Sequence, residues 1–307
     1  MNNRKNRLFL ALIGGVLSTL SASGVSAEGV YREYFPRAQI DPSKGVMGDI
    51  GFSDTVQYWK DAQALEQHKN WIGDPANEWK LNWKHMDLDR SSDFHEGHAA
   101  VDDGEKYVKA MSRAEPSFLT CLGEGKTDLK GVAARYPKYD EKLGRIMTVE
   151  SRVEHCAQTE LWRKDVKQGS PINNAITMYV KAQSTGMPIQ VDIQSKPVME
   201  AYKRGEQLFY TKAGQFNLAC ASCHTPQGTM GQKLRGQVPT TPFGDAASFP
   251  LYRSPLGQVE SLQQRFAICN RQSRTMSLKP GDPAYTDLEV FYTVLSNGYP
   301  VSVPAIR

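Results

Sequence analysis

The spacing of apolar residues predicts several helices in the C-terminal part of the chain. Residues 195–212 predict one helix, with Ser195 as its N-cap and Leu208-Phe209 on its apolar face. Residues 282–298 predict another, because Asp-Pro favours a helix start and Asn-Gly favours a helix end. Residues 259–271, between the two, also have helical spacing. We therefore expect a mainly α chain in which helices are joined by irregular segments.

The apolar run near the N-terminus is too short for a membrane span. Residues 8–20 are mostly apolar, follow three positive residues and lead to small residues that end at Ala27. A spanning helix needs roughly 20 apolar residues, whereas Gly14 and Gly15 interrupt this run. Residues 1–27 therefore predict a cleaved signal peptide, with an uncleaved anchor as the alternative. No other segment is apolar enough to span a bilayer.

Charge and length narrow the classes of protein. The formal charge is +4, and it falls to +1 when the three positive residues of 1–27 are removed. A charge so close to zero gives no reason to expect nucleic acid or an acidic membrane surface as a partner. The remaining 280 residues have room for two domains. Their aliphatic content is modest, which favours small cores that a cofactor helps to fill.

One pentapeptide has the signature of a covalently bound cofactor. Cys220-Ala221-Ser222-Cys223-His224 has the C-x-x-C-H spacing of haem c attachment. Two thiols three residues apart reach two vinyl groups on one porphyrin edge, and the histidine binds the iron. A zinc site needs further Cys or His ligands nearby, and a thioredoxin-like motif needs a βαβ context. The neighbouring sequence has neither, so we expect one haem c.

The chain contains an internal repeat around this motif. Four features of residues 101–192 recur in the same order in residues 193–307. The pairs are Gly104-Glu105 with Gly205-Glu206, Cys121 with Cys220, Arg152-x-x-x-Cys156 with Arg265-x-x-x-Cys269, and GMPIQV from Gly186 with GYPVSV from Gly298. The sequence therefore predicts a duplicated domain, preceded by an N-terminal arm of residues 28–100.

The first copy lacks the haem ligands of the second. When Cys121 is aligned with the first cysteine of the motif, Glu124 and Gly125 take the places of the second cysteine and the histidine. We therefore expect no haem in the first copy. Its cysteines, Cys121 and Cys156, can then meet as a disulfide in an oxidising compartment. Two unconnected buried thiols are the alternative.

Cys269 remains as the fifth cysteine, without a partner in the sequence. Arg265 lies four residues before it, so the two share one face of a helix. A guanidinium lowers the pKa of a neighbouring thiol and offers a fork of donors to an oxyanion. The alternative is a buried cysteine that behaves as a small apolar residue.

The export signal, the duplication, CASCH at 220–224 and the later R-x-x-x-C at 265–269 resemble the SoxA family of bacterial sulfur oxidation. The resemblance covers nearly the whole mature chain. It implies two tandem cytochrome c-like domains, the first without haem and closed by a Cys121–Cys156 bridge. It also implies that Cys269 is the distal iron ligand and active-site residue, often found as a persulfide, and that Arg265 belongs to the same site.

The activity implied by this resemblance is that of an L-cysteine S-thiosulfotransferase in the periplasm. Thiosulfate is joined oxidatively to a cysteine of the carrier SoxYZ, and electrons leave through the haem to SoxX, a monohaem cytochrome that forms the heterodimer. One alternative is a monohaem electron carrier with Met230 or Met276 as the sixth iron ligand. Another is a scaffold cytochrome without catalysis. His95-x-x-His98 has the spacing of a metal site but is predicted to lie on the surface.

Overall fold

The structure is a computed structural model of the 307-residue chain. It describes residues 95–224, 239, 242 and 244–307. The predicted signal peptide, residues 28–94 of the predicted arm and Met230 lie outside the described residues. None of the helices in the described part combines the length and apolar content that a membrane crossing requires.

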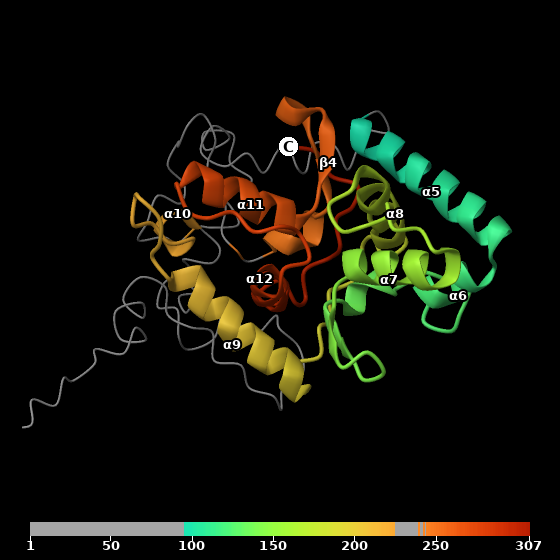
Figure 1. Ribbon diagram of the computed structural model, residues 1–307, viewed down its shortest axis with the longest axis horizontal. Helices are drawn as coiled ribbons and strands as arrows, with labels where there is room; N and C mark the ends of the chain where they lie inside the picture. The colour runs from blue at the N-terminus through green and yellow to red at the C-terminus, as the bar shows by residue number, and fades with distance from the viewer. Residues whose placement is uncertain (1–94, 225–238, 240–241, 243) are drawn as a thin grey trace, which may run out of the picture.

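The same order of elements occurs twice along the chain (Figure 1). The first half (residues 96–182) consists of α5 (Glu96–Ala114), α6 (Ser117–Leu122), the 3-10 turn η4 (Ala133–Arg135), β1 (Lys138–Asp140), β2 (Arg145–Met147), α7 (Val149–Leu161) and α8 (Pro171–Ala182). The second half (residues 196–294) consists of α9 (Lys196–Tyr210), α10 (Ala221–His224), η5 (Asp245–Ser248), β3 (Leu251–Arg253), η6 (Ser254–Leu256), β4 (Gln258–Glu260), α11 (Leu262–Gln272) and α12 (Pro283–Val294). Each half is therefore a set of helices around one short antiparallel hairpin.

The first and last helices of each half cross at a glycine. α5 packs against α8, and α9 packs against α12. A Cβ atom added at Gly104 would lie 2.1 Å from the carbonyl oxygen of Ala175, and one added at Gly205 would lie 2.1 Å from that of Asp287. Only glycine permits so close an approach of two backbones. This geometry explains why the Gly-Glu pair recurs in the two halves.

The core consists of two groups of buried apolar side chains. The smaller group belongs to the first half and includes Phe118, Leu122 and Val153. The larger group is built around the rings of the second half, among them Phe209 and Phe291 with ring centroids 5.0 Å apart. Met178, Ile189 and Val191 of the preceding sequence also belong to the larger group. The two halves are therefore packed on a shared core.

The repeated segments 186–191 and 298–303 pair with each other across the two halves. The amide of Gly186 donates to the carbonyl of Val301 at 2.9 Å, and the amide of Val301 donates to the carbonyl of Met187 at 2.9 Å. Ile189 exchanges two further bonds of 2.9 Å with the chain at 298–299. Each segment thus satisfies the backbone polar groups of the other.

The two helices predicted at 195–212 and 282–298 are confirmed as α9 and α12. Ser195 is the N-cap residue of α9, and the side chain of Asp282 accepts the amide of Ala284 at 2.9 Å at the start of α12. The prediction that Leu208 lies on the buried face of α9 is wrong, because Leu208 is exposed. The buried face runs instead through residues such as Ala201 and Phe209.

The helix predicted at 259–271 begins later than expected. Residues 258–260 form strand β4, whose register pairs Leu251 with Glu260. α11 starts after Ser261, whose side chain accepts the amide of Gln264 at 3.3 Å while the Gln264 side chain accepts the amide of Ser261 at 2.9 Å. This reciprocal capping box fixes the start of the helix. The helical spacing at 259–261 was therefore misleading.

Candidate functional site

The C-x-x-C-H motif forms a tight helical turn that follows α9 in the chain and includes the short helix α10. The carbonyl of Cys220 accepts the amides of Cys223 and His224 at 3.1 and 3.0 Å. The hydroxyl of Ser222 accepts the amide of Ala219 at 3.1 Å and closes the turn from its N-terminal side. The Cys223 thiol and the His224 imidazole therefore lie on the short helix α10 and the Cys220 thiol lies directly before it, and α10 packs against α9.

Helix α11 brings Cys269 to this turn, and in Figure 1 α10 and α11 lie close together. The side chains of Cys269 and His224 are hydrogen-bonded. Arg265 lies one helical turn before Cys269 on the same helix, as the spacing predicted. The turn at α10 and the helix α11 thus bring together residues that are up to 49 positions apart in the sequence, Cys220 and Cys269.

The environment of Cys269 favours its thiolate. Burial raises the pKa of this thiol, but the positive charge of Arg265 and the hydrogen bond with His224 outweigh burial, so the pKa is lowered overall. Cys220 behaves differently, because burial and the nearby Cys269 raise the pKa of its thiol to about 12. Cys220, Cys223 and Cys269 are all free thiols. Of these, Cys269 has the environment of a nucleophile.

The residues of this turn fit a haem c. The donor set consists of two thiols and an imidazole on one turn, with a further sulfur donor, Cys269, approaching from another helix. Tyr292 lies close to Cys220 and Cys269. Burial and the charges of these two thiols raise the pKa of its hydroxyl. Cys220 and Cys223 would hold the cofactor, and His224 would bind its iron. The iron would supply one-electron chemistry.

The second half also contains an arginine cluster, which we define as the buried Arg253 and the half-buried Arg265 and Arg307. The Arg253 side chain is 4% exposed, and its Nε atom lies 3.7 Å from Oε2 of Glu260, beyond hydrogen-bond distance. Burial and the charges of Arg265 and Arg307 lower the pKa of Arg253 to about 10. Burial and the charge of Arg265 also lower the pKa of Arg307, whereas Asp245 opposes this. Sequence reasoning identified only Arg265, because the other two reach the site through the hairpin β3–β4.

The first half contains a disulfide and a closed set of ion pairs in the corresponding region. Cys121 and Cys156 are bonded, with Cα atoms 5.7 Å apart, so the predicted bridge is confirmed and the two separate thiols are excluded. The Arg152 side chain forms an ion pair with Asp140 and donates to the Tyr136 hydroxyl at 3.0 Å. Neither a thiol pair nor a histidine of the C-x-x-C-H type stands in this half.

Glu124, which the repeat aligns with Cys223, belongs to the same polar group. Its carboxylate accepts the Tyr136 hydroxyl at 2.6 Å and a guanidinium nitrogen of Arg135 at 3.2 Å, and it also pairs with Lys138. Burial raises the pKa of Glu124, but these donors outweigh burial and lower it overall. The carboxylate is therefore a charged structural group in this half.

Other candidate ligands are placed away from this arrangement. Met276 is 77% exposed, which disfavours it as an iron ligand, and Met230 lies outside the described residues. The prediction that His95 lies on the surface is wrong: it is buried, and its Nδ1 atom accepts the amide of Gly97 at 3.0 Å as the N-cap of α5. The described residues contain no group of three or more His, Cys, Asp or Glu side chains suited to a metal ion.

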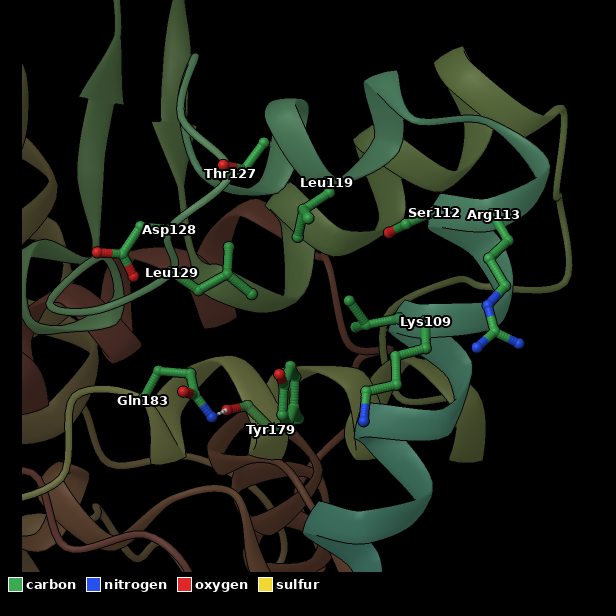
Figure 2. A pocket seen from close by; sticks show the side chains of 10 residues that line it. Lys109, Ser112, Arg113, Leu119, Thr127, Asp128, Leu129, Tyr179 and Gln183 are labelled. Atoms are coloured by element: carbon green, nitrogen blue, oxygen red, sulfur yellow. Dashed lines mark hydrogen bonds between the residues drawn. The ribbon is translucent and has the colours of Figure 1, made fainter.

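A separate pocket of about 440 Å³ lies in the first half, far in sequence from the C-x-x-C-H turn (Figure 2). Its walls come from α5, α6, α8 and the loop before η4, and it combines an apolar floor with Lys109 and Arg113 at the side. None of the predicted site residues lines it. The pocket therefore does not belong to the thiol site.

The fold and the turn define a c-type cytochrome. The model for the SoxA/TsdA cytochrome c domain matches residues 103–189 and 204–301, and the chain belongs to this family. Relatives are named L-cysteine S-thiosulfotransferase subunit SoxA. The one from Pseudaminobacter salicylatoxidans is 30% identical over 76% of this chain and 83% of its own length. The one from Allochromatium vinosum is 30% identical over 69% and 77%.

A solved structure is similar as well. The crystal structure of SoxXA from P. pantotrophus superposes with a TM-score of 0.52 at 27% identity. The similarity covers 58% of this chain and 66% of the matched chain. It supports the mainly helical, cytochrome c-like fold.

Proposed function

We propose that this chain is the catalytic haem c subunit of an L-cysteine S-thiosulfotransferase. In this proposal residues 1–27 direct export to the periplasm, 28–100 form an arm, 101–192 form a cytochrome c-like domain without haem, and 193–307 form the domain that carries one haem. Cys220 and Cys223 would attach the haem, and the imidazole of His224 and the sulfur of Cys269 would bind its iron. The substrates are thiosulfate and a cysteine of a SoxYZ-type carrier, and a SoxX-like monohaem cytochrome accepts the electrons.

The contact between Cys269 and His224 carries this proposal. A thiol with a lowered pKa next to the imidazole of a haem-attachment turn is an unusual position for a structural cysteine. The names of the relatives point to the same chemistry, since both enzymes act on sulfur. Arg265 adds a cation one turn away, suited to the sulfonate end of thiosulfate.

The reaction follows from the properties of these side chains. The Cys269 thiolate forms a bond to the outer sulfur of thiosulfate, its proton having gone to solvent, and two electrons leave as this S–S bond forms. A bound haem would supply one-electron chemistry here, and two equivalents of oxidised partner cytochrome would receive the two electrons. Arg265 binds the sulfonate and so orients the outer sulfur towards Cys269.

Transfer to the carrier is a thiol–disulfide exchange. The carrier thiolate attacks the sulfur that is bonded to Cys269, the bond to Cys269 breaks, and the Cys269 thiolate is regenerated. The low pKa of Cys269 suits it to this role, because a thiol of low pKa is a better leaving group. No net electron transfer occurs in this second step.

Replacing Cys269 by alanine tests the assignment. We expect Cys269→Ala to abolish formation of the carrier–thiosulfate conjugate, as followed by mass spectrometry of the carrier, while the protein still carries the mass of one haem. The exposed Arg271 lies on the same helix, so Arg271→Gln is a matched control that should retain activity. Conjugation at the wild-type rate by Cys269→Ala would falsify the role of this thiol.

The optical and EPR spectra of the oxidised protein test the axial ligand separately. We expect a signature of thiolate ligation that is lost in Cys269→Ala and kept in Arg271→Gln. A methionine signature in the wild-type protein would instead support an electron carrier with a residue such as Met230 on the iron. Two haems per chain would contradict the proposal that the first domain holds none.

A further inference from the structure

The two hairpins of the fold occupy equivalent places and can be compared residue by residue. β1–β2 precedes α7, and β3–β4 precedes α11. Asp140 ends β1 and pairs in register with Arg145, whereas Arg253 ends β3 and pairs with Gln258. By the same register, Met147 in the first half corresponds to Glu260 in the second. The first half therefore serves as an internal reference for the second.

In the first half, the acidic side chain at this position neutralises the arginine of the following helix. Asp140 forms an ion pair with Arg152, and both side chains are largely buried. The backbone amides of Lys142 and Leu143 also donate to the Asp140 carboxylate, at 3.0 and 3.1 Å. Arg152 also donates to the Tyr136 hydroxyl at 3.0 Å. The charges of Asp140 and Arg152 are therefore both paired within the first half.

In the second half, the equivalent position carries the opposite charge. Arg253 replaces the aspartate, so its guanidinium and that of Arg265, the counterpart of Arg152, act on each other as like charges. The Nε and Nη1 atoms of Arg253 are buried and have no hydrogen-bond partner, and neither has Oε2 of Glu260. Glu260 alone, at 3.7 Å, does not satisfy them.

A buried guanidinium with unsatisfied donors is costly unless an anion accepts from it. Both Arg253 and Arg265 lie close enough to Cys269 to interact with its charge. The thiolate of Cys269 raises the pKa of Arg253, and the guanidinium of Arg265 lowers the pKa of Cys269. The charges that face Arg253 from the packed elements are those of Arg265, Arg307, Glu260 and Cys269. Asp245 adds a negative charge that acts on Arg307, but the Nε and Nη1 donors of Arg253 still have no acceptor.

We propose that Arg253 and Arg265 together form a receptor for an oxyanion, which takes the place that the Asp140 carboxylate occupies in the first half. Two planar guanidiniums suit an anion with three or two equivalent oxygens, namely a sulfonate or a carboxylate. Two sources supply this chemistry. One is the sulfonate of thiosulfate, which rests on the proposed function; the other is a carboxylate of the haem itself.

The first half supplies the design of the test. The double variant Arg253→Asp with Glu260→Met copies residues 140 and 147 into the equivalent positions, so Arg265 gains an internal partner and the unpaired groups of Arg253 and Glu260 are removed. We expect the variant to fold and to carry one haem. The exposed Arg271 provides a control with the same change of net charge, Arg271→Gln.

Two readouts on the holoprotein in complex with its partner cytochrome distinguish the sources. Calorimetric titration of the fully reduced complex with thiosulfate measures binding without reaction, because no oxidant is then present. Infrared redox-difference spectra of protein with haem labelled by carbon-13 at its carboxylates measure their hydrogen bonding. If the sulfonate is bound, the Kd for thiosulfate rises about ten- to a hundredfold, as expected for loss of a charge-assisted bond, and the labelled band is unchanged. If the haem carboxylate is bound, the labelled band shifts and the Kd stays within about twofold.

The receptor is refuted if neither readout changes in the double variant, or if Arg271→Gln changes them as much. Should the double variant fail to fold, Arg253→Lys is the second variant, because lysine keeps the positive charge but lacks the planar fork of donors. If the receptor exists, Arg253→Lys changes one of the same two readouts by a smaller amount. A wild-type protein that binds thiosulfate but does not conjugate it would contradict the proposed function while leaving the receptor intact.

Discussion

We expect the stability of the protein to depend on pH through two buried glutamates between the halves. Glu289 of α12 is 3% exposed and accepts the side-chain amide of Gln263 at 2.8 Å. Glu150 of α7 is equally buried, and both of its carboxylate oxygens lack a hydrogen-bond partner. Burial and the charge of Glu150 raise the pKa of Glu289 to about 8, and the charge of Lys181 opposes this only in part.

The sign and size of the effect follow from linkage. Between its ordinary pKa of 4.5 and about 8, Glu289 holds a proton in the folded protein and loses it in the unfolded chain. The folded state therefore binds more protons in this window, and the free energy of unfolding falls as the pH rises through it. A difference of about 3.5 units corresponds to a loss on the order of 5 kcal/mol across the window.

Urea denaturation of the holoprotein at pH values from 5 to 8.5 measures this slope. We expect Glu289→Gln to remove most of the loss, because glutamine stays neutral at every pH. Glu150→Gln should reduce the slope as well, since it removes the like charge. Glu141 is exposed, so Glu141→Gln is a matched control that keeps the wild-type slope. A Glu289→Gln variant with an unchanged slope would refute the assignment of the proton to this carboxyl group.

Two further changes test the packing within each half, the first in the first half and the second in the second half. Replacing Cys121 and Cys156 by serine removes a crosslink between residues 35 positions apart, and the chain-entropy relation gives a loss of about 4 kcal/mol in the free energy of unfolding, measurable by urea denaturation; a loss below 1 kcal/mol would count against this relation here. A Cβ at Gly205 would lie 2.1 Å from the carbonyl oxygen of Asp287, so Gly205→Ala should cost about 1–3 kcal/mol by forcing α9 and α12 apart. The exposed Lys203 on the same helix is the control, because Lys203→Ala should leave the thermal midpoint unchanged.

The sequence predicted the parts of the fold that depend on local signals. Ser195 and the Asp-Pro pair at 282–283 are helix starts, and both helices formed as expected. The disulfide between Cys121 and Cys156 was predicted from the repeat, because an alignment needs no three-dimensional information. The C-x-x-C-H turn likewise depends only on neighbouring residues.

The parts that were not predicted depend on contacts between distant residues. The strands of the hairpins are three residues long, too short for an alternating pattern to be recognised. The role of Arg253 became visible only once the register of the hairpin aligned it with Asp140. The burial of His95 is an exception, because its partner Gly97 is only two residues away, but histidine is not among the residues that signal an N-cap.

The mutual pairing of 186–191 with 298–303 means that neither half is a self-sufficient folding unit. If the chain were divided between the halves, Gly186 and Val301 would each lose a backbone partner, and apolar side chains such as Ile189 would lose their cover. The first half, in which the Cys121–Cys156 bridge is present, therefore contributes part of the core on which the second half is packed.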